Sequence, residues 1–377
     1  MNWDLLILIP TVLFLLYYIQ FVLSARSGLL GIGAPSLTTN RPSVSVLIAA
    51  RNEQDNVAMC LRSVLDQDYP VESMEVILID DGSIDGTSAI AEGFASRDSR
   101  LKILTLPDAS ENIASRKPAA LAAGIQVAKG EIILTTDADC TVGTFWISSI
   151  IRSFDTDTAF VAGPVQELSS LSLISRISRL EFLGIIGTSA GLISNGTPII
   201  CNGANVAYRR ASFFESGGFG DSAGFCDDEV IMHRIRSRNS GGIRCSIDKD
   251  SMVSTHAPSS LSDFWKQRIR WASKRGHYDN KSILLKLSGL YVSFLMLLVL
   301  FIASFFAPHL WPFVFVLFAT KIVVDYAALR TSARLLHQKV EARYFLLAEL
   351  LHVPYIVLAA LAGQLSSLEW KGQRIRG

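Results

Sequence analysis

The sequence is poor in charge and lacks a cysteine pattern. Charged residues make up 18% of its 377 residues, and the formal net charge is +1. A chain with so little net charge offers no bulk electrostatic attraction to nucleic acid. The five cysteines are scattered without a Cys-x-x-Cys pair. This argues against a zinc site or a disulfide framework and favours reduced thiols in a cytosolic setting.

Several signature motifs are also missing. No Gly-x-Gly-x-x-Gly follows the first predicted strand, which disfavours a dinucleotide-binding fold. No Gly-x-x-x-x-Gly-Lys-Ser/Thr is present, which disfavours a P-loop NTPase. The chain has no His-Glu-x-x-His, and no Gly-x-Ser-x-Gly follows a predicted strand. Zinc-protease and α/β-hydrolase chemistry therefore have no support in the sequence.

Long apolar runs are abundant, since half of the residues are hydrophobic. Leu5–Ala25 and Leu287–Ala307 are uncharged and long enough to span a bilayer. Leu310–Leu329 and Tyr344–Leu368 have similar lengths but carry ionisable residues. No basic residue precedes the first run and no cleavage site is evident, so we interpret it as a membrane anchor and not as a signal peptide.

Basic residues beside these runs predict their orientation. Arg26 follows the first run and a basic cluster precedes the second, so the positive-inside rule places the N-terminus outside and the intervening domain in the cytoplasm. The cluster consists of Lys266, Arg268, Arg270, Lys274, Arg275 and Lys281. The rule also places Arg330–Arg343 inside, which puts the basic tail 369–377 outside if Tyr344–Leu368 crosses fully. We favour a full crossing over a re-entrant segment broken near Pro354, and expect a multi-pass protein of the cell (inner) membrane.

Two pairs of ionisable residues lie within the apolar runs. Lys321 and Asp325 are four residues apart in the third run, and Glu349 and His352 are three apart in the fourth. Ionisable groups inside a span are costly and usually pair or line a site. We expect both pairs to face the interior of the helix bundle, either as structural pairs or in handling an acceptor.

Between Pro42 and about Ser260, strand patterns alternate with helix patterns. The predicted strands are Val44–Ala50, Glu75–Ile79, Leu101–Leu104 and Glu131–Thr136. The predicted helices are Glu53–Asp66, Thr87–Arg97, Lys117–Lys129 and Phe145–Phe154. Repeated β-α-β units predict an α/β fold with a mostly parallel sheet and helices on both faces.

Three polar segments fall at the carboxyl ends of these strands, where such sheets bind ligands. They are Arg51-Asn52-Glu53, Asp80-Asp81 and Asp137-Ala138-Asp139. An Asp-x-Asp at a strand end is usually a turn, but it can also hold a hard divalent cation that is shared with substrate phosphates. The coincidence of three polar segments at one predicted edge favours a site.

Taken together, these segments resemble the membrane-bound glycosyltransferases of family 2, which have the Rossmann-like, nucleotide-sugar-binding GT-A fold. The matching segments are Ala49-Ala-Arg-Asn-Glu53, Asp80-Asp-Gly-Ser83, Lys117 at a helix start, Asp137-Ala-Asp139, Gly203-Ala-Asn205 followed by Arg209 and Arg210, Asp227-Asp-Glu229, and Gln267-Arg-Ile-Arg-Trp271, which matches the Q/RxxRW signature. The resemblance covers about Pro42 to Trp271 and extends to processive polysaccharide synthases and ceramide-glucosyltransferase-like enzymes.

The resemblance implies an inverting, metal-dependent hexosyltransferase. It would transfer a sugar from a nucleotide-diphosphate sugar, with a UDP-sugar as the expected donor, to a lipid-linked or growing glycan acceptor among membrane lipids. The implied donor-binding residues are Ala50, Arg51, Glu53, Asp80, Asp81, Lys117, Asp137 and Asp139. Those on the acceptor and diphosphate side are Asp227, Gln267, Arg270 and Trp271. Asp139 and Asp137 would hold Mg²⁺ or Mn²⁺ against the departing diphosphate.

The resemblance also selects a catalytic base. Inversion needs a carboxylate that takes the proton of the acceptor hydroxyl. In the family this residue is the second member of an acidic pair, and an arginine follows it by six positions. Arg234 follows Asp228 by six, so we predict Asp228 as the base and Asp227 as its acidic neighbour. Three acidic residues at a helix start can also serve only the helix dipole.

Two segments keep alternative interpretations. Gln267–Trp271 is either the signature motif or only part of a basic amphipathic helix at the lipid headgroups. The largely apolar Leu168–Ile193, interrupted by Arg176, Arg179 and Glu181, is either a helix buried against the sheet or, as the resemblance suggests, an acceptor-side helix close to the membrane.

The expected organisation has five parts. They are an N-terminal transmembrane helix (1–27), a cytoplasmic GT-A catalytic domain (28–260), an amphipathic interface helix with the signature motif (261–283), three transmembrane helices (284–368) and a basic tail (369–377).

Three C-terminal spans are few for a translocation channel, which favours a lipid-linked or short glycan product over a processive polysaccharide synthase. A non-catalytic membrane scaffold with this fold is a different class, and the intact acidic motifs argue against it. A transporter fits poorly.

Overall fold

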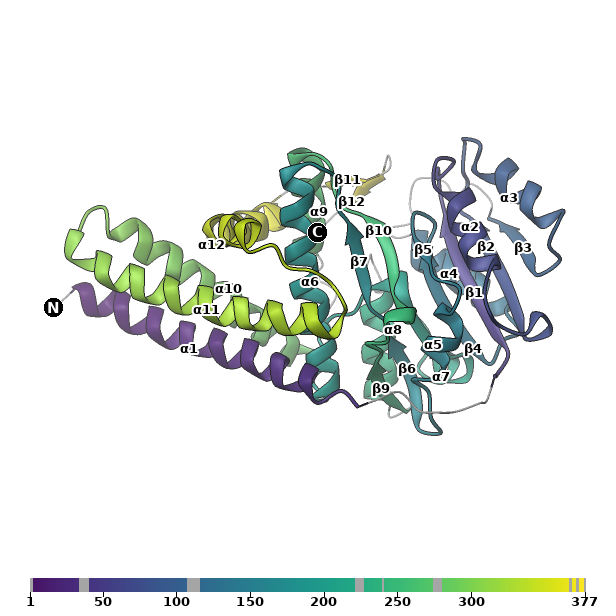
Figure 1. The fold of residues 1–377 in the computed structure, drawn as a ribbon, viewed down its shortest axis with the longest axis horizontal. Helices are drawn as coiled ribbons and strands as arrows, with labels where there is room; N and C mark the ends of the chain where they lie inside the picture. The colour runs from purple at the N-terminus through teal and green to yellow at the C-terminus, as the bar shows by residue number, and fades with distance from the viewer. Residues whose placement is uncertain are drawn as a thin grey trace. The chain divides into compact units, whose positions relative to one another are not determined.

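The computed structural model describes residues 3–33, 41–106, 116–220, 227–238, 241–273, 280–365, 368–370 and 373–375. The chain divides into two compact units (Figure 1). We call Gly31–Leu168 with Leu192–His256 the sheet unit, and Met1–Leu30 with Ser169–Gly191 and Ala257–Gly377 the helical unit. Each unit has hydrophobic core residues of its own.

A seven-stranded sheet forms the centre of the sheet unit, in the order β3-β2-β1-β4-β8-β6-β9. Its strands are β1 (Val44–Ala50), β2 (Met74–Asp80), β3 (Leu101–Thr105), β4 (Ile132–Asp137), β6 (Thr158–Ala162), β8 (Val206–Arg209) and β9 (Gly242–Cys245). All neighbours pair in parallel except β8, which runs antiparallel to both β4 and β6. The predicted α/β fold with a mostly parallel sheet is confirmed.

Helices alternate with these strands, and a small second sheet in the order β5-β10-β7 completes the unit. The helices are α2 (Val57–Leu65), α3 (Thr87–Ala95), α4 (Arg116–Val127), α5 (Trp146–Ile151), α7 (Arg210–Glu215) and α8 (Asp227–Ser237), with short 3₁₀ turns at Val71–Ser73, Gly203–Asn205 and Lys249–Ser251. The strands of the second sheet are β5 (Thr141–Val142), β7 (Val165–Leu168) and β10 (Val253–His256). The elements predicted up to residue 154 are all present, with ends shifted by a few residues.

The core of the sheet unit follows from apolar strands that are covered on both faces. Six of the seven residues of β1 are buried, as expected for a central parallel strand. Helix α4 lies close to this strand because Gly124 has no side chain. A Cβ at Gly124 would meet Ile79 at 2.9 Å and Leu47 at 3.5 Å. This packing fixes the start of α4, which carries Lys117, relative to the strand ends.

The helical unit contains the long apolar helices together with one shorter amphipathic helix. They are α1 (Trp3–Leu30), α6 (Leu173–Ser194), α9 (Leu261–Ala272), α10 (Lys281–Ala303), α11 (Trp311–Leu335) and α12 (Ala342–Leu365), with a 3₁₀ turn at Pro308–Leu310 and a hairpin of β11 (Leu368–Trp370) and β12 (Gln373–Ile375). Helices α1, α10 and α11 lie side by side (Figure 1). Five helices among the described residues are long and apolar enough to cross a membrane, which indicates a membrane protein.

Four of these five helices coincide with the predicted apolar runs, namely α1, α10, α11 and α12. Helix α12 continues through Pro354, so the break considered at that proline is absent. Lys274 and Arg275 of the predicted basic cluster, and part of the predicted basic tail, lie outside the described residues.

The fifth candidate span is α6, whose small residues allow close packing on other helices. A Cβ at Gly187 would meet Ser332 of α11 at 1.9 Å, and a Cβ at Gly191 would meet the Ala25 carbonyl of α1 at 1.8 Å. Most of α6 therefore belongs to the helical unit. The glycines place this helix against α1 and α11 within the helical unit.

A buried polar cluster joins three of the apolar helices. Lys321 Nζ lies 2.6 Å from Asp325 Oδ2, 2.6 Å from Glu349 Oε2 and 3.0 Å from His352 Nδ1. Tyr18 Oη of α1 donates to Asp325 Oδ1 at 2.7 Å. Only 1% of the Lys321 surface is exposed. The prediction that both ionisable pairs face the interior of the bundle is confirmed.

Candidate active site

The predicted polar segments meet at one edge of the sheet. The parallel register places Ala50, the last residue of β1, beside Asp80, the last residue of β2. On the other side of β1, Ala49 is beside Asp137, which ends β4. Since the carboxyl ends of three adjacent parallel strands coincide, the side chains that follow them share one edge.

The loop after β1 is tied to the loop after β2. Arg51 Nη1 donates to the Asp81 carbonyl at 3.0 Å. Asn52 has a φ of 53°, in the left-handed region that asparagine tolerates better than most residues. In this conformation its backbone N–H donates to Ser83 Oγ at 3.0 Å, while its side-chain Oδ1 accepts from the Ile84 N–H at 2.9 Å. The two loops therefore form one frame.

Asp80 and Asp81 are both buried within this frame. Asp80 Oδ1 accepts from the Ser83 N–H at 3.0 Å and so closes the turn after β2. Gly82 provides the turn with a φ of 71°, which favours glycine. Glu53 is held from the neighbouring loop, because its N–H donates to Thr87 Oγ1 at 2.7 Å and its Oε2 accepts from Asn56 at 3.0 Å.

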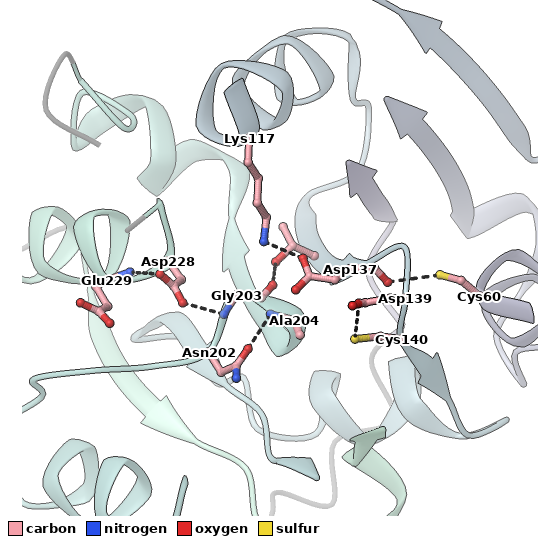
Figure 2. Close-up of polar contacts among 11 residues, drawn as sticks. Cys60, Lys117, Asp137, Asp139, Cys140, Asn202, Gly203, Ala204, Asp228 and Glu229 are labelled. Atoms are coloured by element: carbon pink, nitrogen blue, oxygen red, sulfur yellow. Dashed lines mark hydrogen bonds and ion pairs between the residues drawn. The ribbon is translucent and has the colours of Figure 1, made fainter. Parts of the chain in front are cut away.

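The Asp-x-Asp segment at the end of β4 carries a group of side chains of the kinds that bind metal ions (Figure 2). Asp137, Asp139 and Cys140 each offer one ligand atom, and these atoms lie within 4.8 Å of one another. Lys117 Nζ donates to Asp137 Oδ1 at 2.6 Å (Figure 2). Cys140 Sγ contacts Asp139 Oδ1 at 3.4 Å. Cys140 was not predicted as part of the site, although its position next to Asp139 in the sequence was a signal.

The electrostatics of this group favour a cation. Partial removal of water raises the pKa of the Asp139 carboxyl, and the carboxylates of Asp137 and Glu53 raise it further. Burial raises the pKa of the Cys140 thiol, so this sulfur stays protonated at neutral pH. Two carboxylates beside a protonated thiol form a donor set for a hard divalent cation such as Mg²⁺ or Mn²⁺. The residues present therefore fit the metal that the resemblance implies.

Asp228 is linked to the same strand through Gly203. Thr135 of β4 donates its hydroxyl to the Gly203 carbonyl at 2.8 Å, and the Gly203 N–H donates to Asp228 Oδ2 at 2.7 Å (Figure 2). The other Asp228 oxygen, Oδ1, accepts from the Glu229 N–H at 2.9 Å. Asp228 is 7% exposed. Its carboxylate thus has a fixed orientation at the start of α8.

Asp227 also starts α8, but its side chain and residues 221–226 lie outside the described residues. The orientation of the side chain is therefore described for only one member of the predicted acidic pair, Asp228.

Other matching residues serve the fold. Asn205 Nδ2 donates to the Pro164 and Ser251 carbonyls at 2.7 and 2.8 Å, and its Oδ1 accepts from Trp146 Nε1 at 2.9 Å. Arg209 is beside Ile132, at the opposite end of β4 from Asp137, and pairs with Glu131 at 2.6 Å. Arg210 donates to the Ile125 carbonyl at 3.4 Å. These residues do not join the carboxylate group.

Comparison with known proteins identifies a domain that lies mostly within the sheet unit. Residues 45–216 match the model of glycosyl transferase family 2. The chain carries a glycosyltransferase family 2 domain. Residues 256–373 match the model described as protein of unknown function (DUF3307). Asp227, Asp228 and the α9 residues lie outside the stretch that matches family 2.

Curated relatives of this chain include an N-acetylglucosaminyltransferase and a polysaccharide synthase. The chain is 28% identical over 250 residues to an N-acetylglucosaminyltransferase of Rhizobium meliloti, which covers 63% of this chain and 57% of the relative. It is 26% identical over 242 residues to poly-beta-1,6-N-acetyl-D-glucosamine synthase of Staphylococcus aureus, which covers 62% of this chain and 54% of the relative. The chain spans about half the length of the curated relatives it matches.

A solved structure supports the fold. A mannosyltransferase from Pyrobaculum calidifontis, in complex with GDP-Man and Mn²⁺, matches with a TM-score of 0.56 and 19% identity, covering 94% of this chain and 97% of that one. Together with the family 2 match, this similarity confirms the predicted GT-A fold.

Outside the family 2 domain, the predicted Gln267, Arg270 and Trp271 lie on α9 in the helical unit. The helix begins at a Ser260 cap, whose Oγ accepts from the Asp263 N–H at 3.1 Å. The Trp271 ring packs against Phe182 of α6, with ring centroids 6.1 Å apart. The sequence analysis assigned no role in the site to Arg268, which lies between these residues, or to its partner Glu181.

Proposed function

We propose that the chain is an inverting, metal-dependent glycosyltransferase that transfers a sugar from a UDP-sugar to a lipid-linked or growing glycan acceptor at the membrane. The observation that carries this proposal is the group of Asp137, Asp139 and Glu53 carboxylates beside Lys117, at the sheet edge where the family 2 domain has its polar loops. UDP-N-acetylglucosamine is the first donor to test, because the named relatives transfer or polymerise this sugar.

Donor binding would use the frame formed by the first two loops. The Asp80 and Asp81 carboxylates would accept hydrogen bonds from the uracil N–H and the ribose hydroxyls, and the hydrogen bond from Arg51 to the Asp81 carbonyl supports this role by holding the loop that carries them. Lys117 would contribute positive charge where the diphosphate departs. Its present contact with Asp137 supports this role, because it places the ammonium group beside the predicted metal ligands.

Asp139 and Asp137 would hold Mn²⁺ or Mg²⁺. When bound, the metal would supply positive charge that stabilises the departing diphosphate. The repulsion among the carboxylates of Asp137, Asp139 and Glu53 supports this assignment, because a cation relieves it. The Mn²⁺ bound by the Pyrobaculum calidifontis mannosyltransferase is consistent with it.

Asp228 would act as the base for the acceptor hydroxyl. Its carboxylate is oriented by the Gly203 and Glu229 N–H groups, and it follows the metal segment in the chain, as the family pattern requires. The proton would move from the acceptor hydroxyl to Asp228 as the new glycosidic bond forms with inversion. Asp227 would be its acidic neighbour.

The acceptor would be engaged at the membrane by Gln267, Arg270 and Trp271 of α9. The candidate spans support a multi-pass topology, and the basic residues beside them support a cytoplasmic catalytic domain. A short or lipid-linked product is the primary proposal. The synthase name of the Staphylococcus aureus relative favours the second candidate, a processive polysaccharide synthase.

The test is release of UDP from a panel of nucleotide sugars by the full chain in vesicles of bacterial polar lipids. We expect release from UDP-N-acetylglucosamine with Mn²⁺, loss of release in excess EDTA and recovery on adding Mn²⁺. Asp139→Ala should reduce the rate by about 10²-fold or more, as for loss of a principal electrostatic stabiliser. Full activity in excess EDTA would contradict the metal assignment. Binding of nucleotide sugars without any turnover would indicate a non-catalytic scaffold, and product length separates single from processive transfer.

A further inference from the structure

Arg268 of α9 is buried against α6. Its side chain is 3% exposed. Its Nε and Nη2 donate to Glu181 Oε2 at 2.9 and 2.6 Å, and Nη2 also donates to Ser178 Oγ at 3.1 Å. A planar guanidinium held by several hydrogen bonds has one orientation, which a lysine could not reproduce.

The same guanidinium contacts two residues of the signature motif. Its Nη1 donates to Gln267 Oε1 at 2.5 Å. Its central carbon lies 4.3 Å from the centroid of the Trp271 ring and 4.4 Å from that of Phe264. Because the Gln267 oxygen accepts this hydrogen bond, the amide nitrogen of Gln267 is directed away from Arg268. The cation–π contact fixes the plane of the Trp271 indole. One buried charge therefore orients both the glutamine and the tryptophan.

Helix α12 supports the other side of this arrangement. The Tyr355 hydroxyl donates to Glu181 Oε1, so Glu181 is held from two helices. The Tyr355 ring also meets the Phe264 ring edge-on, with centroids 5.7 Å apart. At Gly363 a Cβ would lie 3.0 Å from Ala272 Cβ and 3.1 Å from the Ile269 carbonyl, so α9 and α12 approach closely. Helix α9 is thus held by α6 through charge and by α12 through backbone contact.

Stability alone gives little reason to bury this ion pair. Removing a carboxylate and a guanidinium from water is costly, and apolar residues of similar volume often stabilise a fold equally well. What apolar residues cannot supply is the directed contact to Gln267 and Trp271. We propose that Glu181 and Arg268 are positioning residues that hold Gln267 and Trp271 in the orientation that engages the acceptor. This inference rests on the proposed function for the role of the motif, but its geometric part is independent of catalysis.

The experiment replaces the ion pair by apolar side chains in the full chain, in vesicles of bacterial polar lipids. The test variant is Glu181→Leu with Arg268→Met. The matched control is Glu341→Leu with Arg176→Met, because Arg176 is also on α6 and pairs with Glu341 at 3.4 Å while touching none of the motif residues named above. Each protein is labelled with 5-fluorotryptophan, and the Trp271 ¹⁹F resonance is assigned with Trp271→Phe. Thermal stability and UDP release from UDP-N-acetylglucosamine are measured on the same samples.

We expect the test variant to fold, the Trp271 resonance to move by more than its linewidth, and UDP release to fall about 10- to 100-fold, as expected for misplaced positioning groups. The control should leave both the resonance and the rate unchanged. A folded test variant with a wild-type Trp271 resonance and rate would overturn the proposal.

A second variant covers the case in which the apolar pair does not fold. Tyr355→Phe keeps the ion pair and the ring contact with Phe264 but removes the hydroxyl that donates to Glu181. A smaller shift of the Trp271 resonance and a partial loss of UDP release would support the proposal, whereas no change in either would overturn it. If the wild-type chain releases no nucleotide from any donor, the proposed function fails while the Trp271 resonance still decides the positioning role.

Discussion

Lys117 Nζ lies 2.6 Å from Asp137 Oδ1, so the predicted donor-contacting lysine forms an ion pair with a predicted metal ligand. The lysine ammonium and a divalent cation would compete for the same carboxylate. A cation bound at Asp137 would take over the charge of the lysine and free the ammonium to move toward the diphosphate. We therefore expect Lys117 to couple the occupancy of the metal position to that of the diphosphate position.

Lys117→Met should tighten Mn²⁺ binding in the absence of nucleotide. The gain should be about 2- to 5-fold, because both side chains are partly exposed and water screens such a pair. UDP binding should weaken in the same variant, since the positive charge near the diphosphate is lost. Electron paramagnetic resonance of free Mn²⁺ and calorimetry with UDP measure the two effects. Lys102→Met, which removes a lysine paired with Glu75 at 2.6 Å, is the control. Unchanged or weaker Mn²⁺ binding in Lys117→Met would contradict the coupling.

The raised pKa of Asp139 predicts a pH-dependent effect on stability. Because the pKa in the folded state lies above the unfolded value, ionisation of Asp139 opposes folding of the metal-free protein. The destabilisation is complete above the raised pKa and disappears as the pH falls below the unfolded value of about 4. Asp139→Asn should therefore raise the Tm slightly at pH 7 in EDTA, with a smaller gain at lower pH, and the gain is small because the Asp139 side chain is exposed and water screens its charge. Saturating Mn²⁺ should reverse the order and make the wild type more stable. A lower Tm for the variant in EDTA at pH 7 would refute the electrostatic argument.

The buried Lys321 cluster predicts a large effect on stability. Lys321→Leu would leave the Asp325 and Glu349 carboxylates buried without their cation, and should cost about 3–5 kcal/mol of unfolding free energy. Replacing all three residues by leucine should cost less than the single change, because no charge is left unpaired. Unfolding in mixed detergent micelles measures both effects. Normal acceptor kinetics in the triple variant would assign the cluster a structural role, and reduced transfer with a normal fold would assign it a role with the acceptor.

The parts of the fold predicted most accurately are the strands whose limits and parallel pairing follow from local residue patterns. The first strand, Val44–Ala50, was predicted residue for residue because it is apolar throughout and ends at a polar loop. The meeting of Asp80 and Asp137 followed from parallel pairing. By contrast, β8 has four residues and no usable periodicity, so its antiparallel place between β4 and β6 was not predicted.

Contacts between distant segments account for the rest of what was missed. Helix α6 associates with α11 and α1 through glycines whose partners are far away in the sequence, so no local pattern indicated its neighbours. The Arg268–Glu181 pair joins residues separated by 87 positions, and only the folded chain shows that they meet. In the same way, the hydrogen bond from the Gly203 N–H that orients Asp228 has no sequence signature.

The last prediction separates the two aspartates at the start of α8. Asp228→Asn keeps the shape of the side chain and retains an oxygen that can accept from the Gly203 N–H, but it removes the basicity that deprotonation of the acceptor requires. UDP binding should stay nearly unchanged while transfer falls by about 10²-fold or more. Asp227→Asn, as the matched neighbour, should retain more activity than Asp228→Asn. Calorimetry with UDP and the rate of UDP release in the presence of acceptor vesicles give the two readouts. If Asp228→Asn transfers at the wild-type rate and Asp227→Asn is inactive, the predicted register is wrong by one residue and Asp227 is the base.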